Sequence, residues 1–230
     1  MSKHYVEKIL KARVYDVARE TPLDLAPLLS GRLGNRVYLK REDLQPVFSF
    51  KIRGAYNRIL NLSDSEKRRG VIAVSAGNHA QGVALAAKYL SVSALVVMPE
   101  TTPPIKIDAV CRYGADIVLH GNFFSESLKY AQSLATEKNR VFIPPFDNVD
   151  VIAGQGTVAM EIFRQHTTPI KAIFVPVGGG GLIAGISAYV KALWPEVLVI
   201  GVEPVDAPTL HAALSAGEPV SLDQVGIFAD

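Results

Sequence analysis

The sequence predicts an open α/β fold with a parallel β-sheet and two lobes. Short, uninterrupted apolar runs recur along the chain, as in strands that are buried on both faces of a parallel sheet. Helix-like segments alternate with these runs and supply the crossovers that parallel strands need. The middle of the chain contains its own series of strands and helices, which indicates a second lobe inserted into the first.

Each predicted element is bounded by residues that interrupt its pattern. The run 71–74 ends at Ser-Ala-Gly-Asn, a Thr-Pro-Pro turn follows 94–98, and four glycines follow 173–177. The predicted strands are 71–74, 94–98, 117–119, 141–143, 173–177 and 197–202. The predicted helices are 81–89, 105–113, 125–138, 159–165 and about 182–193, and a further helix opens near Lys51.

The lobes are predicted to be discontinuous in sequence. Residues 1–52 and 147–230 are expected to form a large domain, and 53–146 a small inserted α/β domain. Neither an internal repeat nor a low-complexity linker marks the boundaries.

Composition excludes several classes of protein. With 49% hydrophobic and 20% charged residues, the 230-residue chain is globular. Its net charge is +2, and basic and acidic residues are interleaved, so the sequence has no basic stripe typical of nucleic-acid binding. The single cysteine excludes an internal disulfide and fits a reducing compartment such as the cytoplasm. No cluster of His or Cys has the spacing of a structural zinc site.

One uncharged segment, 172–190, has the length of a membrane helix. Pro176 and four consecutive glycines interrupt it, so it is interpreted as a strand, a glycine loop and a helix. We therefore predict no membrane-spanning segment.

Lys51 is the first candidate for chemistry. It lies between Phe50 and the nearby Arg53, where a helix begins. A neighbouring cation and partial desolvation disfavour an ammonium group, so more free amine is available to attack a carbonyl. An ordinary lysine on the first turn of an amphipathic helix is the commoner explanation of these residues taken alone.

The four glycines Gly178, Gly179, Gly180 and Gly181 follow a strand and open a helix. Main-chain N–H groups can close on a phosphate there without interference from side chains, and the helix dipole favours the anion. Read from Gly179, the loop also fits G-x-G-x-x-A, and Glu203 at the end of the next strand could hold a ribose. A dinucleotide oxidoreductase is therefore an alternative.

A second strand-to-helix loop, 75–82, is rich in small and polar residues. Its N–H groups, the Ser75 hydroxyl and the Asn78 amide suit a carboxylate or a ring oxygen at a helix N-terminus. An ordinary N-cap would look the same. A dinucleotide-binding fold, however, has no reason to place a second anion-binding loop in another βα unit. The segments 144–147 and 154–157 are interpreted as a loop and a helix start, and Thr157 as a helix cap in preference to a polar contact.

Together, the segments 49–54, 75–82 and 178–182 resemble the tryptophan-synthase-β-like (fold type II) pyridoxal-phosphate enzymes. The similarity is greatest to the serine/threonine dehydratase branch with its biosynthetic threonine deaminases, and it extends through 40–43 and 151–157. The resemblance implies the two-lobed fold type II architecture and a pyridoxal 5'-phosphate cofactor. It also implies β-elimination and deamination of L-threonine, and more weakly of L-serine, to 2-oxobutanoate and ammonia in isoleucine biosynthesis.

The resemblance also implies roles for individual residues. Lys51 would bond to the cofactor aldehyde and then act as the base on the substrate Cα. Phe50 would lie near the cofactor ring, and Asn78 would donate to the ring hydroxyl oxygen. The phosphate would accept from the N–H groups of Gly178, Gly179, Gly180, Gly181 and Leu182. The substrate carboxylate would be held by Ser75, Gly77 and His79.

Two local departures refine this expectation. Ala76 stands where racemases of this family have a serine that transfers a proton on the opposite face, which favours elimination over racemisation. Thr209 stands where the same branch has an aspartate metal ligand, so no metal is predicted although Glu203 and Ala207 match.

A third departure concerns length, because the family continues where this sequence stops at Asp230. We therefore expect an incomplete large domain whose partner for the pyridine nitrogen lies beyond Asp230. A catalytically impaired fragment with weak or no cofactor binding is the corresponding alternative. The resemblance also favours a homo-oligomer, dimer or tetramer, that acts on a small amino acid.

Overall fold

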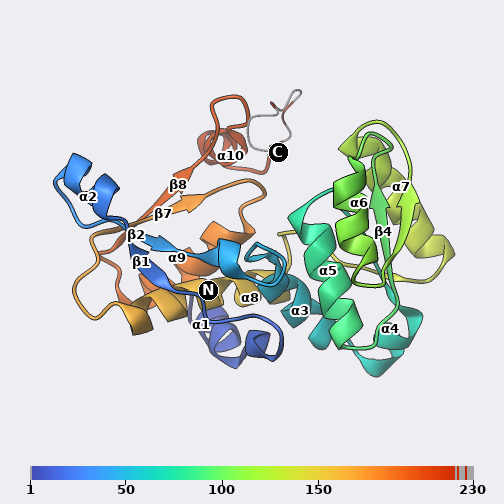
Figure 1. Ribbon diagram of the computed structural model, residues 1–230, viewed down its shortest axis with the longest axis horizontal. Helices are drawn as coiled ribbons and strands as arrows, with labels where there is room; N and C mark the ends of the chain where they lie inside the picture. Colours follow the sequence, from blue (N-terminus) through green and yellow to red (C-terminus); the bar gives the residue numbers. More distant parts are fainter. Residues whose placement is uncertain (1, 221, 223–225, 227–230) are drawn as a thin grey trace.

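The computed structural model of the chain describes residues 2–220, 222 and 226 (Figure 1). The last residues of the predicted large domain, which include Asp230, lie outside this range. The helices are α1 (Ser2–Lys11), α2 (Pro27–Leu33), α3 (Lys51–Leu60), α4 (Asp64–Arg69), α5 (Asn78–Tyr89), α6 (Pro104–Cys111), α7 (Phe124–Glu137), α8 (Val149–Gln165), α9 (Gly181–Leu193) and α10 (Thr209–Ala216). The strands are β1 (Leu23–Leu25), β2 (Tyr38–Lys40), β3 (Val71–Val74), β4 (Ala94–Met98), β5 (Asp116–Leu119), β6 (Val141–Phe142), β7 (Ala172–Pro176) and β8 (Leu198–Val202).

Figure 1 shows two lobes, with α3 between them. The small lobe consists of α4 to α7 around a four-stranded sheet, whose strand order is β5-β4-β3-β6 and whose pairs are all parallel. The large lobe contains the parallel pair β7-β8 with α1, α8 and α9, and the antiparallel pair β1-β2. The predicted α/β class with a parallel sheet is thereby confirmed. The exact domain boundaries at 52/53 and 146/147 stay a prediction.

The small-lobe sheet is buried on both faces, as its apolar strands predict. Along β3, Val71 and Ala73 contribute to the core shared with α3 and α5, whereas Ile72 and Val74 belong to the core beneath α7. This alternation follows the two-residue period of a strand. A separate core between α8, α9 and β7 holds the large lobe together.

Helix α8 packs against α3 on one side and α9 on the other, so closely that the main chains of the helices touch. A Cβ on Gly154 would lie 2.6 Å from the Arg53 carbonyl oxygen, and one on Gly185 would lie 2.5 Å from the Ile152 carbonyl oxygen. Only glycine permits such approaches. Because α3 begins at Lys51 and α9 begins at the glycine loop, this three-helix layer fixes both candidate segments.

The predicted strands agree with the observed ones to within a residue or two, but α8 begins at Val149 and not at 159. The segment 154–157, interpreted above as a helix start, lies inside the helix. The cap is Asn148, whose Oδ1 accepts from the N–H groups of Asp150 and Val151. The interpretation of Thr157 as a cap is therefore wrong, since it lies buried in the middle of α8, where its hydroxyl accepts from Arg53 and so makes the polar contact that was the other possibility.

The segment 172–190, considered above as a membrane helix, forms β7, the glycine loop and most of α9. No helix in the described part of the chain combines the length and the hydropathy needed to span a membrane.

Candidate active site

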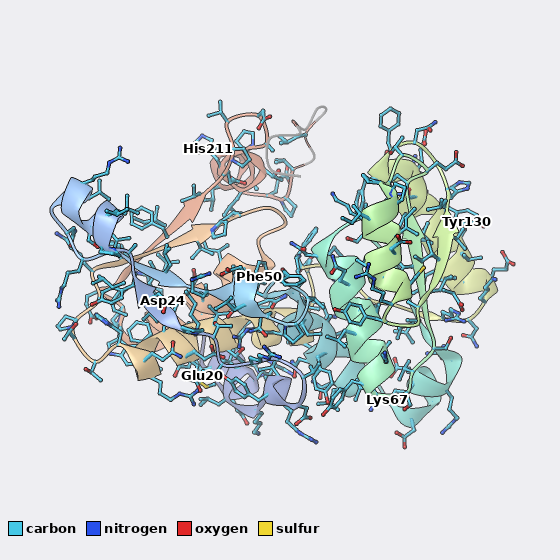
Figure 2. All side chains as sticks on the ribbon, viewed as in Figure 1. Glu20, Asp24, Phe50, Lys67, Tyr130 and His211 are labelled. Carbon is cyan, nitrogen blue, oxygen red and sulfur yellow. The ribbon has the colours of Figure 1, made fainter. Side chains whose placement is uncertain are left out.

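Lys51 is the first residue of α3, and its amine points to the connection between the lobes. Its Nζ donates a hydrogen bond to the Pro145 carbonyl at 2.8 Å and lies 5.6 Å from the centre of the Phe50 ring. Phe50 lies where the helices of the two lobes meet (Figure 2). Burial lowers the pKa of Lys51 to about 8. The amine is therefore far easier to deprotonate than that of an exposed lysine.

The expected contribution of a neighbouring cation to this pKa is wrong. The Arg53 side chain turns away from Lys51 and is fully buried between two carboxylates. Its guanidinium donates to Glu42 at 2.7 and 2.8 Å and to both oxygens of Glu161. Desolvation alone lowers the pKa of Lys51, while Arg53 anchors α3 to its neighbours.

The glycine loop has the open geometry that an anion site requires. Gly180 adopts φ 84°, a left-handed conformation that favours glycine, and the 13-residue helix α9 begins at the next residue. Within the described part of the chain, the N–H groups of Gly178 to Leu182 have no hydrogen-bond acceptor. A Cβ built on Gly178 or Gly180 would meet nothing within 4 Å. Unpaired N–H groups at the positive end of a helix favour a phosphate.

The loop 75–82 connects β3 to α5 and offers a second set of free donors. The Ser75 Oγ accepts from the Gly77 N–H at 3.0 Å, which leaves the hydroxyl proton free to donate. Asn78 is exposed and is the first residue of α5. The first hydrogen bond of this helix joins the Gln81 N–H to the Gly77 carbonyl. The N–H groups of Asn78, His79 and Ala80 are thus available to an anion.

His79 contributes to this loop only through its main chain. Its ring is 4% exposed and bonds from Nε2 to the Ile143 carbonyl at 2.9 Å. Because a carbonyl only accepts, Nε2 carries the proton. Burial lowers the pKa of His79 to about 4, so the ring is neutral near pH 7. The ring is therefore a positioning group and not a cationic partner for a carboxylate.

One short segment, 143–146, brings the predicted site residues together, and we call it the strap. The Ile143 carbonyl holds His79, the Pro145 carbonyl holds Lys51, and Phe146 packs against the glycine loop. A Cβ on Gly179 would lie 2.0 Å from the Phe146 ring. The loop 75–82, Lys51 and the glycine loop therefore surround one segment at the junction of the lobes.

Reasoning from the sequence missed the strap and the charge cluster around Arg53. Pro-Pro-Phe at 144–146 carries no chemical signature beyond that of a loop. Glu42 and Glu161 lie far from Arg53 along the chain, so no spacing connects them.

The alternative role of Glu203 as a ribose ligand is not supported. Its two carboxylate oxygens accept from the N–H groups of Leu210 at 2.7 Å and His211 at 2.9 Å. Glu203 therefore caps the N-terminus of α10, and the geometry gives no support to a dinucleotide site there.

Comparison with known proteins agrees with this geometry. The model of a family described as pyridoxal-phosphate dependent enzymes matches residues 14–230. A biosynthetic, chloroplastic threonine dehydratase of Arabidopsis thaliana is 60% identical over 226 residues, which cover 98% of this chain and 38% of the relative. A biosynthetic L-threonine dehydratase of Pasteurella multocida is 57% identical over 98% of this chain and 44% of its own length. The chain thus spans less than half the length of these relatives.

A solved structure, the processed form of threonine deaminase isoform 2 from Solanum lycopersicum, superposes with a TM-score of 0.97 at 52% identity. The match covers all of this chain and 63% of that one. The expected resemblance to threonine deaminases and their fold is therefore confirmed. By these matches, the chain belongs to the family of pyridoxal-phosphate dependent enzymes.

Proposed function

We propose that the chain carries the catalytic lysine and the cofactor cradle of an enzyme that eliminates and deaminates L-threonine. The products are 2-oxobutanoate and ammonia, and L-serine reacts more weakly. One observation carries this proposal: a partly buried lysine with a pKa of about 8 is held next to an open glycine loop by a single strap. The threonine dehydratases and the threonine deaminase reported above support the choice of substrate.

Pyridoxal phosphate fits the residues of this site. Lys51 offers an amine that loses its proton readily, and the unpaired N–H groups of 178–182 match a phosphate. Phe50 supplies an apolar wall, and the exposed Asn78 amide has no other described partner and can donate to the ring oxygen. When bound, this cofactor supplies the electron sink that stabilises negative charge at the substrate Cα.

Lys51 then acts as the general base. With a pKa near 8, about a tenth of its amine is neutral at pH 7, and this neutral Nζ can take the proton from the substrate Cα. The Pro145 carbonyl, which accepts from Nζ, restricts where the lone pair points. An exposed lysine would be almost fully protonated at the same pH and would have no fixed direction.

The substrate carboxylate is assigned to the N-terminus of α5. Ser75 donates through its hydroxyl, and His79 through its main-chain N–H, at the positive end of the helix dipole. Gly77 keeps the loop free of a side chain, since a Cβ there would meet nothing within 4 Å. Ala76 offers no group that could return a proton to the opposite face, so elimination is favoured over racemisation.

Further parts of the proposal concern setting and assembly. We propose that the small inserted domain runs from residue 53 to residue 146. We also propose that the reaction belongs to isoleucine biosynthesis. A cytoplasmic location is consistent with a single cysteine, although relatives described as chloroplastic or mitochondrial make fractionation the deciding measurement.

A homo-oligomer, either dimer or tetramer, is supported by one face of the β7-β8 pair. Phe174, Leu198 and Val202 are 67%, 52% and 49% exposed, and strand register places them on the face opposite the core that Val175 shares with α9. Apolar side chains grouped in this way are typical of a covered surface. Light scattering during gel filtration measures the state, and a monomer would contradict this part.

The central test is to add pyridoxal phosphate and then L-threonine to the purified chain. We expect an absorbance band near the visible edge when the cofactor bonds to Lys51, followed by release of 2-oxobutanoate. Lys51→Ala should abolish the band and reduce ketoacid formation by at least about a hundredfold. Lys88→Ala, at an exposed position on α5, is the matched control. Cofactor binding and turnover that survive the loss of Lys51 would refute the proposal.

A further inference from the structure

The strap connects the two halves of the proposed cofactor site through consecutive residues. The Pro145 carbonyl accepts from Lys51 at 2.8 Å, and Phe146 contacts the glycine loop. The path from the amine to the loop therefore consists of one hydrogen bond, one peptide unit and one van der Waals contact. The alternative path leaves α3 at Arg53 and Gly54, crosses α8 at Gly154 and Gly156, and reaches the loop through Gly185 of α9.

Phe146 contacts the glycine loop with both its ring and its main chain. A Cβ on Gly179 would lie 2.0 to 2.4 Å from three atoms of the ring. A Cβ on Gly181 would lie 3.0 Å from the Cα of Phe146 and 3.1 Å from its carbonyl oxygen. Gly179 and Gly181 thus leave the room that Phe146 occupies, while Gly178 and Gly180 border open space.

Phe146 is itself held in place by the start of α8. Its carbonyl accepts from the Asn148 N–H at 2.9 Å, and the Asn148 side chain caps α8. The ring is 37% exposed, so it is not a core residue whose loss would empty the interior. Its contacts with the loop and its position next to Pro145 are its distinguishing features.

We propose that Phe146 is a positioning residue that sets the spacing between the Lys51 amine and the glycine loop. The proposal rests on the proposed function, because the spacing matters only if one ligand must reach both ends. A ligand with an aldehyde at one end and a phosphate at the other must match that spacing. An aldehyde without a phosphate meets only the lysine and does not depend on the loop.

The test compares the binding of pyridoxal phosphate and phosphate-free pyridoxal, measured by the absorbance change when the aldehyde bonds to Lys51. In Phe146→Ala, the affinity for pyridoxal phosphate should fall by about tenfold, the equivalent of about 1.4 kcal/mol. The affinity for pyridoxal should change much less. Phe146→Leu keeps an apolar side chain against Gly179, so its affinity for pyridoxal phosphate should lie between those of the wild-type chain and Phe146→Ala. Phe123→Ala, which removes an exposed ring at the start of α7 in the small lobe, is the control.

A double substitution tests the contact directly. Gly179→Ala should weaken the binding of pyridoxal phosphate, because its methyl group collides with the Phe146 ring. In the Gly179→Ala, Phe146→Ala double variant the collision is gone, so part of the affinity should return. The two effects should therefore be non-additive.

Three results would overturn the proposal: unchanged affinity for pyridoxal phosphate in Phe146→Ala, additive effects in the double variant, or a wild-type chain that binds both aldehydes equally. If Phe146→Ala does not fold, as judged by circular dichroism, Phe146→Leu and Gly179→Ala decide the question. Binding is measured without substrate. A chain that binds as expected but releases no 2-oxobutanoate would therefore refute the proposed function and leave this inference standing.

Discussion

Replacing Arg53 with methionine tests what holds α3, and with it Lys51, in place. Arg53 is fully buried, and its guanidinium is bonded to Glu42, Glu161, the Thr157 hydroxyl and the Arg19 carbonyl. Methionine keeps most of the volume but leaves two carboxylates without this partner. Lys40 at 2.6 Å is the remaining cation on Glu161. Removing one partner of a buried ion pair costs about 3–5 kcal/mol, a large share of the roughly 5–15 kcal/mol that stabilises a typical domain.

The penalty should depend on pH with a predictable sign. In the wild-type protein burial raises the pKa of Glu161, but the bonds and charges of Arg53 and Lys40 outweigh burial and hold the pKa below its usual value. A lowered pKa contributes stability that is present above the unfolded pKa and lost as the pH falls. Without Arg53, burial should raise the pKa of Glu161 above its unfolded value. Protonation of Glu161 then stabilises the folded variant, so the free energy of unfolding of Arg53→Met should fall as the pH rises from 5 to 8.

Urea unfolding at pH 5 and pH 8 measures both effects, with the m-value showing whether the same surface is exposed. Arg58→Met is the matched control, since Arg58 lies on the same helix but forms a partly exposed pair with Asp150. Its loss should cost no more than about 1 kcal/mol, with little change between the two pH values. A loss below about 1 kcal/mol in Arg53→Met, or an equal loss at both pH values, would refute the reasoning about the charge cluster.

Two further predictions concern the amine and the helix layer. Because burial lowers the pKa of Lys51 to about 8, its rate of reaction with pyridoxal should fall about tenfold for each pH unit below 8 and level off above it; a stopped-flow profile that is flat from pH 6 to 9 would contradict this. Gly154→Ala should destabilise the fold by about 1–3 kcal/mol in urea unfolding, because its Cβ would lie 2.6 Å from the Arg53 carbonyl oxygen. Gly31→Ala, in α2 with nothing within 4 Å of the new methyl group, should be neutral or slightly stabilising. Equal effects of the two alanines would show that backbone contact is not the cause.

Much of this architecture could be predicted because its signals are local. Strands such as β3 and β4 are buried on both faces, so their sequences are continuously apolar and their ends are marked by glycine, proline or asparagine. Gly178 to Gly181 could be placed at a helix start because few other roles suit four adjacent glycines. The chemical types of the site residues followed from the same local patterns.

The features that the sequence did not reveal depend on contacts between distant segments. The start of α8 was placed too late because glycine weakens an isolated helix, yet here Gly154 and Gly156 allow α8 to touch α3 and α9. Arg53 looked like a neighbour that would depress the pKa of Lys51, but its charge is neutralised by Glu42 and Glu161. The antiparallel pair β1-β2 was missed because three-residue strands carry too little periodicity to recognise.

The layer of α3, α8 and α9 has a mechanical consequence. Where helices meet through side chains, a displacement of one is partly absorbed by changes of rotamer in the other. Gly154 and Gly185 bring main-chain atoms into direct contact, and main-chain atoms have no such freedom. A displacement of one of the three helices is therefore less easily absorbed at these contacts, so the start of α3 and the start of α9 are coupled through α8 while the strap links the Lys51 amine itself to the loop.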